Sequence, residues 1–532
     1  MQWPRWGENT PISTAVSPRR LGRRNPRMPP RLRHLRMRAR KVIVTTMLRT
    51  LLRAPLLAAI LAPLSLLAAG CAPAPRGDPA DSPARAGPPV LDGDISEWGD
   101  ASVLADGQYL YVRWSTGRAD YPPQAAPYTT AILLDLDDSA ATGLMRSAGG
   151  EVLGVDLEVL LSPGGNEGTQ AGVRIAAVSA AGERTPIPHA EAGFSFCPTY
   201  AATWFEGRLS RSLPTGAISG PAVVGVVAIV DHEGRVLGES EAFRRRLPAR
   251  MASVPSGQIP APGAETLRVV SYNVLKSGPV ARPEPFERIL RALAPDVVLL
   301  QEWDDRASID PWFNTRLGDL GRWYVRAGEG GVAIASRHPL EEAGPDAVVI
   351  APEGPEGRGY RPVRVVAGLA RTPIGDVLVS SLHLKCCGTA GGVEDRARLA
   401  EARAVNAAVL KGIDDQRVSH VVIGGDFNLV GSRPPLDLAR AALDADGSDL
   451  AIADARVLGD RAYDTWSDAR SAFGPGRLDF LAFSDASAQA ARAFVVDTAR
   501  LGRAALGASG LLPGDSAAAS DHLPVVVDLR SR

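Results

Sequence analysis

Nine residues, Val421–Leu429 (VVIGGDFNL), constrain the fold of this chain more than any other stretch. Apolar residues run into two glycines, which is the pattern of a buried strand that ends in a turn. Asp426 and Asn428 follow at positions i and i+2, so on an extended backbone their side chains point to the same side. A carboxylate and an amide there can orient a water, or bind a metal ion and a phosphate oxygen. Both residues are also common in ordinary turns, so the interpretation depends on what accompanies them.

The same pattern recurs from Thr266 to the C-terminus, where apolar strands alternate with helical segments. Strands are expected at 267–275 (LRVVSYNVL) and 297–303 (VVLLQEW), and helices at 286–293 and about 393–410. Strands that are apolar on both faces must be covered on both faces. The pattern therefore predicts a layered α/β domain in which helices cover sheet.

Polar side chains interrupt these strands at or near their ends. Any one of them could be a cap, a turn residue or a satisfied half-buried residue. Burying eight without purpose would be costly, so convergence at one face is the simpler explanation. It predicts a site for a metal ion and a phosphate. The eight residues are Asn273, Glu302, His383, Asp426, Asn428, Asp479, Asp521 and His522.

Taken in order over residues 266–532, six motifs resemble the endonuclease/exonuclease/phosphatase family. They are SYNVL, LLQEW, SLHL, GGDFN, RLDF and SDHLPV. The resemblance implies a two-sheet α/β sandwich like that of the pancreatic-type deoxyribonucleases, and hydrolysis of phosphoester bonds with Mg²⁺ or Mn²⁺. It also implies that Glu302 is the principal metal ligand, with Asn273 and Asp521 beside it.

The resemblance assigns the remaining polar residues to the phosphate and the attacking water. His383 and His522 would flank the phosphate and stabilise charge on its oxygens. Asp479 would orient His522 through a hydrogen bond. Asp426 would activate the water, and Asn428 would steady the water or the phosphate.

Two positions at which this chain differs from some members of the family indicate which branches it resembles. Apurinic-site members carry an Asp where this chain has Leu275, and a Tyr where it has His383. The histidine favours the nuclease, sphingomyelinase and phosphoinositide-phosphatase branches. Pancreatic-type nucleases need a further acid to hold the first histidine, and Glu329 is the candidate, with an exposed loop acid as the alternative.

A phosphate-binding arginine is expected in the segment GRGYRPVRV, for which Arg361 is the candidate. Solvated arginines on an edge strand are the alternative. The segment contains Arg358, Arg361 and Arg364.

The N-terminal region resembles a bacterial lipoprotein signal. Residues 1–46 carry Arg or Lys at twelve positions, and residues 54–75 contain no charge and include LLAAILAPLSLLAAG. Small residues then lead into Cys71, the expected lipidated residue. The signal would span 47–71 with Met47 as the start, so the basic leader need not be translated. A transmembrane helix is the alternative. The predicted location is outside the cytoplasm, anchored by lipid to a bacterial membrane and facing the periplasm or cell exterior.

Between the signal and the C-terminal domain, short apolar strands separated by Gly, Asp and Pro turns predict an all-β sandwich. The clearest strands are expected at 110–115, 130–137, 155–161 and 223–230. The resulting domains are a Pro-rich tether at 72–89, a β-sandwich accessory module at 90–248, a linker at 249–265 and the α/β domain at 266–532.

The accessory module contains LDGDISEWGDA, LYVRW and LDLDDSAATG, which resemble family-9-type carbohydrate-binding modules. The resemblance implies a structural Ca²⁺ and a glycan ligand. Trp98 and Trp114 could stack on a sugar, although a sandwich of this size usually buries such rings. The acidic residues that could bind Ca²⁺ are Asp92, Asp94, Asp135, Asp137 and Asp138. The alternative is that these residues only form turns.

The net charge bears on binding to nucleic acid, and the cysteine spacing bears on zinc sites and disulfides. Formal net charge is +0 for the whole chain, so the part beyond the basic leader is acidic, which argues against broad charge-driven adhesion to nucleic acid. Cys197, Cys386 and Cys387 have no zinc-ligand spacing. A disulfide is allowed outside the cytoplasm, but adjacent cysteines pair poorly, so no pairing is assigned.

Three functions are compatible with these patterns. The first is a secreted, lipid-anchored nuclease that hydrolyses phosphodiester bonds by metal- and His-assisted water attack. The second keeps this chemistry but acts on a phospholipid or small phosphoester. The third is a surface binding protein with an inactive catalytic fold, which the complete polar set disfavours.

Overall fold

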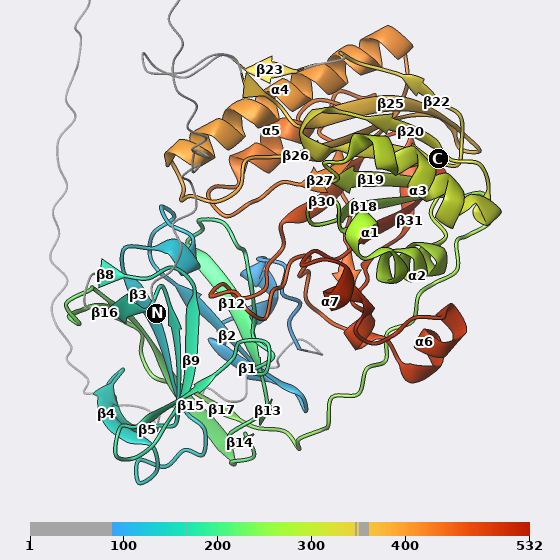
Figure 1. Ribbon diagram of the computed structural model, residues 1–532. Coiled ribbons are helices and arrows are strands. Elements are labelled where there is room, and N and C mark those ends of the chain that lie inside the picture. The colour runs from blue at the N-terminus through green and yellow to red at the C-terminus, as the bar shows by residue number, and fades with distance from the viewer. Residues whose placement is uncertain (1–87, 166–167, 346–347, 351–360) are drawn as a thin grey trace, which may run out of the picture. The chain divides into compact units, whose positions relative to one another are not determined.

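The computed structural model describes residues 88–532, except 166–167, 346–347 and 351–360 (Figure 1). The basic leader, the predicted signal, Cys71 and most of the tether therefore lie outside the described residues. By their contacts, the described residues from 88 to 532 belong to one unit.

The N-terminal part of the described chain is all-β, as predicted. One sheet has the order β1-β2-β12-β11, and a seven-stranded sheet has the order β10-β9-β6-β3-β15-β16 with β17 also on β15. Side chains from both sheets form one core that includes Val112, Ile132 and Phe205. The strands of these two sheets are β1(Val103–Ala105), β2(Tyr109–Ser115), β3(Thr129–Asp135), β6(Leu157–Leu161), β9(Val173–Val178), β10(Arg184–Ile187), β11(Ser195–Cys197), β12(Trp204–Ser210), β15(Ala222–Val230), β16(Val236–Glu239) and β17(Phe243–Arg246).

One expected strand is divided in two. The segment predicted as a single strand at 155–161 contains the end of β5(Glu151–Val155), which pairs with β4(Leu144–Ala148), and all of β6, which pairs with β3 and β9. The break lies at Asp156, whose carboxylate accepts a hydrogen bond from Leu136 N. The backbone of Asp156 remains paired, since its N donates to Leu134 O and its O accepts from Val178 N, so Asp156 marks the point where the chain changes from pairing with β4 to pairing with β3 and β9.

The C-terminal part is a two-sheet α/β sandwich. The first sheet has the order β20-β21-β19-β18-β32-β31-β29 and the second β22-β25-β26-β27-β30-β28. The strands are β18(Leu267–Asn273), β19(Val297–Gln301), β20(Tyr324–Ala327), β21(Ala333–Ser336), β22(Leu340–Glu342), β25(Val365–Thr372), β26(Gly375–His383), β27(His420–Asp426), β28(Ala451–Ile452), β29(Arg456–Val457), β30(Asp479–Phe483), β31(Ala488–Val495) and β32(Val525–Ser531).

Helices cover the outer faces of the two sheets (Figure 1). The apolar residues between the sheets include Val269, Leu299, Val379 and Leu481. Strands such as β18 and β19 are buried along their whole length because both of their faces are covered. The helices are α1(Gly278–Ala281), α2(Pro283–Leu293), α3(Arg306–Arg316), α6(Arg503–Ser509) and α7(Asp515–Ala519) on the first sheet, and α4(Val393–Gln416) and α5(Pro434–Arg440) on the second.

Parallel pairing at the centre of each sheet brings the strand ends together. β18 is parallel to β19, with Asn273 opposite Gln301, and β26 is parallel to β27, with His383 opposite Asp426. The glycines before Asp426 allow the second pairing, because a Cβ at Gly425 would lie 1.8 Å from Leu382 O. The predicted polar residues therefore lie at one edge of the domain.

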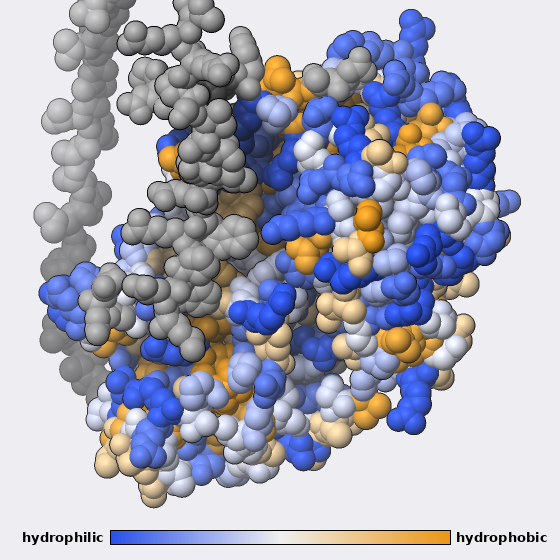
Figure 2. All heavy atoms as spheres, in the orientation of Figure 1, coloured by the Kyte–Doolittle hydropathy of each residue, from blue (hydrophilic) through white to orange (hydrophobic). Residues whose placement is uncertain are grey.

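The face of the molecule in Figure 2 is largely polar, and its apolar residues lie in small groups. Among the described residues, no helix has both the length and the apolar character needed to span a bilayer.

Candidate active site

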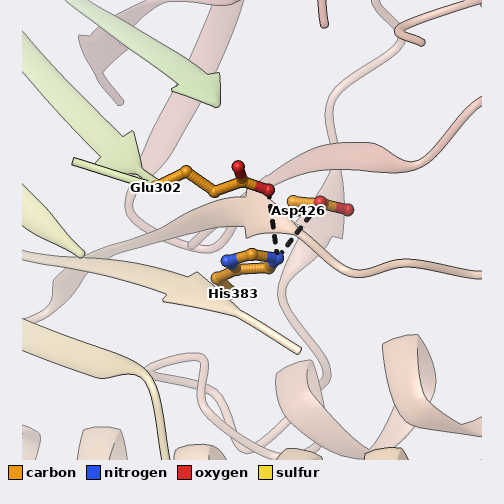
Figure 3. Close-up of side chains that lie close together, drawn as sticks. All are labelled: Glu302, His383 and Asp426. Carbon is orange, nitrogen blue, oxygen red and sulfur yellow. Dashed lines mark ion pairs between the residues drawn. The ribbon is translucent and has the colours of Figure 1, made fainter. Parts of the chain in front are cut away.

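The strand ends bring two overlapping groups of ionisable side chains together. The first consists of Glu302, His383 and Asp426, whose ligand atoms lie within 4.8 Å of one another (Figure 3). The Nε2 atom of His383 lies 3.9 Å from Glu302 Oε1 and 3.5 Å from Asp426 Oδ2. Asn273 joins the two carboxylates, since its Nδ2 donates to Glu302 Oε1 and to Asp426 Oδ2 at 3.2 Å each.

The second group consists of Asp426, Asp479 and His522. His522 Nδ1 lies 2.8 Å from Asp479 Oδ2, and its Nε2 lies 3.8 Å from Asp426 Oδ2. The carboxylate at Nδ1 requires a proton on that nitrogen, which leaves Nε2 directed at Asp426. Asp479 is held in turn by Thr465, whose Oγ1 accepts from Asp479 N at 2.9 Å.

Asn428 holds the carboxylate shared by both groups. Its Nδ2 donates to Asp426 Oδ2 at 3.0 Å and to Leu384 O at 3.1 Å, while its backbone N donates to Asp426 Oδ1 at 2.9 Å. Asp426 is thus fixed by hydrogen bonds from one side and faces both histidines on the other.

Burial and neighbouring charges separate the protonation states of these groups. Burial raises the pKa of Asp426 to about 7, helped by Asp479 and Glu302. Burial lowers the pKa of His522, but Asp479 and Asp426 outweigh it and raise that pKa to about 10. Burial, with the cation of Arg364, lowers the pKa of His383. The site at neutral pH therefore contains a cationic His522, a neutral His383 and a carboxylate with the pKa of a general base.

The expected metal ligands offer the oxygens that Mg²⁺ prefers. Ser520 Oγ donates to Asn273 O at 2.8 Å, which fixes the segment of Asp521 to the end of β18. Among the described residues, no Arg or Lys forms an ion pair with Glu302 or Asp521, so their charge is left for a cation. Asn273 Oδ1 accepts from Leu275 N at 3.1 Å, so binding a metal through this oxygen requires a turn of the amide. With that adjustment Asn273 and Glu302 fit a divalent cation, whereas Asp521 belongs to neither of the two groups.

Two residues at the site did not stand out in the sequence. Arg364 Nη1 lies 2.8 Å from His383 Nδ1, and its Nη2 donates to Leu384 O at 2.6 Å. Trp466 Nε1 donates to Asp521 Oδ2 at 3.1 Å. Arg364 is one of three arginines in its segment, and Trp466 lies in none of the six motifs, so position along the chain does not distinguish them.

The other two candidates for this site pair with side chains outside the two groups. Glu329 pairs with Arg306 at 2.9 Å and is exposed, so it is not the acid that holds His383. Arg361 pairs with the buried Glu401 at 2.7 Å. The described partner of His383 besides the two carboxylates is a cation, Arg364.

The aspartates expected to bind Ca²⁺ do not form one group. Asp135 and Asp137 come together with Asp156, within 4.8 Å, and the sequence did not suggest Asp156. Asp92 and Asp94 instead line a cavity of about 300 Å³ with Asp454 and Arg477. The spacing of turn acids along the chain does not reveal which turns meet in space.

The tryptophans of the sandwich differ in exposure, and the cysteines differ in their bonding. Trp98 and Trp114 are buried, so neither can stack on a sugar, whereas Trp204 is 40% exposed. Cys386 and Cys387 form a disulfide directly after the segment of His383, and Cys197 is a buried free thiol.

Comparisons with known proteins concern the C-terminal half. No curated protein matches the chain. Similar solved structures include the endonuclease/exonuclease/phosphatase from Bacteroides vulgatus, at 15% identity over 51% of this chain and 100% of that one, with a TM-score of 0.35. Sphingomyelinase C from Streptomyces griseocarneus matches at 19% identity over 50% and 99% (TM-score 0.32), and the 3′-5′ exonuclease from Neisseria meningitidis at 19% over 50% and 100% (TM-score 0.32).

The assignment of the C-terminal domain to a family comes from its amino-acid sequence. The profile of the Endonuclease/Exonuclease/phosphatase family covers residues 270–522, just under half of the chain. This range begins in β18 and ends at His522, so it contains every polar residue of the two groups. The C-terminal domain is therefore an Endonuclease/Exonuclease/phosphatase family domain, and the protein is a metal-dependent phosphoester hydrolase.

Proposed function

We propose that the protein is a phosphodiesterase that hydrolyses nucleic acid outside the cytoplasm. The observation that supports it best is the position of Asp426, held by Asn428 and placed between His383 and His522. This arrangement offers a base for a water and a cationic donor for a phosphate oxygen within one buried site.

In the proposed reaction Asp426 accepts a proton from the attacking water, and Asn428 keeps its carboxylate oriented. His522, held cationic by Asp479, donates a hydrogen bond from Nε2 to a phosphate oxygen. His383 contributes a neutral imidazole beside the same oxygens. A divalent cation held by Glu302, Asn273 and Asp521 would neutralise charge on the phosphate. The water oxygen forms a bond to phosphorus as the bond to the leaving oxygen breaks, in a single step without a covalent intermediate, and the cation would stabilise the charge on the leaving oxygen.

A substrate panel on the full-length chain tests the proposal. Plasmid DNA, RNA, sphingomyelin vesicles, phosphatidylcholine vesicles and a small aryl phosphodiester would each be incubated with Mg²⁺, with Mn²⁺ or with EDTA. Release of acid-soluble nucleotides supports the nuclease, and release of phosphocholine supports the phospholipid alternative. Turnover of none of them would leave the binding-protein alternative.

Two substitutions test the site itself. Asp426→Asn and His522→Ala should each lower kcat at least about 100-fold, because general acid–base groups contribute about 10²–10⁴. The thermal midpoint should change little for Asp426→Asn, which preserves side-chain volume. Asp415→Asn and His232→Ala, at exposed positions, are the matched controls. A near-wild-type rate in either site variant would contradict the assignment.

We also propose that the protein is exported and anchored by lipid on Cys71. The support is the sequence of the signal segment alone. Cys71→Ser should move the protein from the membrane fraction to the soluble fraction. Continued sedimentation with membranes would favour an uncleaved helix.

For the accessory module we propose Ca²⁺ bound by Asp135, Asp137 and Asp156. Burial raises the pKa of Asp156 to about 6, and the nearby Asp137 and Asp135 add to it, so a cation would relieve repulsion among the three. Added Ca²⁺ should raise the thermal midpoint of the wild type but not of Asp156→Asn. Glycan binding is proposed through the exposed Trp204, and loss of retention on polysaccharide in Trp204→Ala would support it.

A further inference from the structure

We propose that the β-sandwich is part of the catalytic unit, because its segment Cys197–Ala201 holds the loop that follows Asp426 and the loop that precedes Asp479. Thr199 is the positioning residue at the centre of this contact. The inference rests on the proposed function of the site, and it gives the accessory module a role other than binding a ligand.

Thr199 contacts two loops next to catalytic residues through one hydroxyl, whose single proton is shared between two carbonyl oxygens. Its Oγ1 lies 2.8 Å from Leu429 O and 3.2 Å from Arg477 O, and the residue is 9% exposed. Leu429 directly follows Asn428, and Arg477 precedes Asp479 by two residues. Two residues further along, Ala201 N donates to Gly431 O at 2.8 Å. The sandwich therefore binds the backbone of both loops immediately beside the groups that act on water and on His522.

A second set of contacts holds the loop between β29 and β30. Gly474 N donates to Gln124 Oε1 at 2.8 Å, and Val173 N donates to Ala472 O at 2.8 Å. His189 Nε2 lies 3.1 Å from Ser471 O. Three separate parts of the sandwich thus bond to three successive parts of this loop.

The same loop is bonded to the catalytic residues. Its Trp466 donates to the Asp521 carboxylate, and its Thr465 accepts from Asp479 N at 2.9 Å. Leu523 N donates to Thr465 O at 2.7 Å, directly after His522. Hydrogen bonds and the backbone between them therefore connect the sandwich, through residues 465–477, to the segment of His522.

Packing alone does not fix the contact between Thr199 and the two loops. Thr199 and Arg477 line the cavity of about 300 Å³ between the sandwich residues Asp92 and Asp94 and the C-terminal domain. The neighbouring Phe427, Leu429 and Phe480 are packed in the core, and the directional bonds of Thr199 fix the backbone on the side that faces the cavity. Displacement of a catalytic group by about 1 Å can cost about 100-fold in rate, so these bonds bear on turnover.

The test compares Thr199→Val, Thr199→Ser and Thr129→Val in the full-length chain with Mg²⁺ and the substrate that the wild type turns over. Thr199→Val should lower kcat about tenfold with KM within twofold of wild type. Thr199→Ser keeps the hydroxyl and should restore kcat. Thr129→Val is the matched control, because the buried Thr129 donates to Ser162 O at 2.7 Å wholly within the sandwich.

Hydrogen exchange provides a readout that does not depend on turnover. In Thr199→Val, peptides covering 426–431 and 476–480 should exchange faster, while Thr129→Val leaves them unchanged. If Thr199→Val fails to fold, Gln124→Leu, which removes the acceptor of Gly474 N, should speed exchange in 471–478 and lower kcat.

The outcomes separate this inference from the proposed function. Unchanged kcat and unchanged exchange in both variants would overturn the inference while leaving the hydrolase intact. A wild type that turns over no phosphoester would defeat the proposed function, and exchange would still decide whether Thr199 positions the loops. Loss of kcat in Thr129→Val equal to that in Thr199→Val would show a merely structural effect and would also overturn it.

Discussion

Glu302 directly follows β19 and has a φ of 61°, an uncommon conformation for a residue with a side chain. Its Oε2 accepts from Lys276 N at 3.2 Å and its Oε1 from Asn273, so both oxygens are directed into the strand-end site. Strained backbone of this kind persists where the surrounding structure holds it, and it is concentrated at functional sites. The geometry supports Glu302 as the principal metal ligand.

Replacing Glu302 with Gln should raise the Mg²⁺ concentration for half-maximal activity about tenfold or more, because a neutral amide binds a hard cation less well. Metal titrations of kcat would measure the shift. Glu342→Gln, at a side chain 82% exposed on β22, is the matched control. An unchanged Mg²⁺ requirement would point to a different ligand.

Glu206, on β12 of the sandwich, should make stability depend on pH. Burial raises its pKa to about 8, against hydrogen bonds from Gly93 N and Trp98 Nε1 that lower it. The folded state then binds a proton that the unfolded state has released. The free energy of unfolding should therefore fall as the pH rises from about 4.5 to 8, by up to about 1.4 kcal/mol per pH unit.

Urea unfolding at several pH values would measure this effect as the difference between wild type and Glu206→Gln. The variant should lack this component of the slope, whereas Glu183→Gln, at an exposed position, should keep it. If the free energy of unfolding changed with pH in the same way in wild type and in Glu206→Gln, the raised pKa of Glu206 would be contradicted.

At the scale of elements, β27 links the core to the site. Its two glycines occupy positions where the chain is closely surrounded: a Cβ at Gly424 would meet Leu481, and one at Gly425 would meet the backbone oxygen of Leu382. The side chain of Leu481 can shift, but the backbone of β26 cannot move without breaking the pairing of His383 with Asp426. The second glycine is therefore the more constrained.

Gly425→Ala should lower the free energy of unfolding by at least about 2 kcal/mol and reduce turnover, because the added methyl separates β26 from β27. Gly507→Ala in α6 is the control, since nothing lies within 4 Å of a Cβ there. Chemical denaturation would measure the free energy of unfolding of both variants, and steady-state kinetics would measure their kcat. Equal stability of the two variants would contradict the close approach.

At the scale of the whole molecule, a buried ion pair joins the sandwich to the C-terminal domain. Arg208 on β12 pairs with Asp460, with Nη2 2.8 Å from Oδ2, and their side chains are 2% and 5% exposed. Ser195 adds a hydrogen bond to Asp464 at 2.8 Å, and Leu91, Tyr111 and Ala462 lie in one apolar cluster. The two domains are thus expected to unfold together.

Asp460→Asn should lower stability by about 3–5 kcal/mol, because it removes the charged carboxylate that pairs with the buried Arg208 and lies 3.4 Å from Arg500. Calorimetry should then show two transitions where the wild type shows one. Asp415→Asn breaks an exposed helical pair with Lys411 and should cost less than about 1 kcal/mol. A single unshifted transition for Asp460→Asn would mean that the pair does not couple the domains.

Much of the fold could be predicted because it depends on local patterns. The continuous apolar runs of β18, β19 and β27 reflect burial on both faces, and the helix expected at 393–410 is α4. The fold classes of both domains are confirmed. The order of the motifs also predicted that Asn273, Glu302, His383, Asp426 and His522 meet, because residues at the ends of neighbouring strands lie at one sheet edge.

What only the tertiary structure decided depends on contacts between distant segments. Arg364 rather than Glu329 lies beside His383, Asp156 joins Asp135, and Thr199 reaches Leu429 across 230 positions. Periodicity and turn chemistry act over a few residues and carry no information on which loops meet. The sequence by itself therefore determined most of the strands and the polar side chains that meet at their ends, whereas the packing of the two domains decided which other side chains hold them in place.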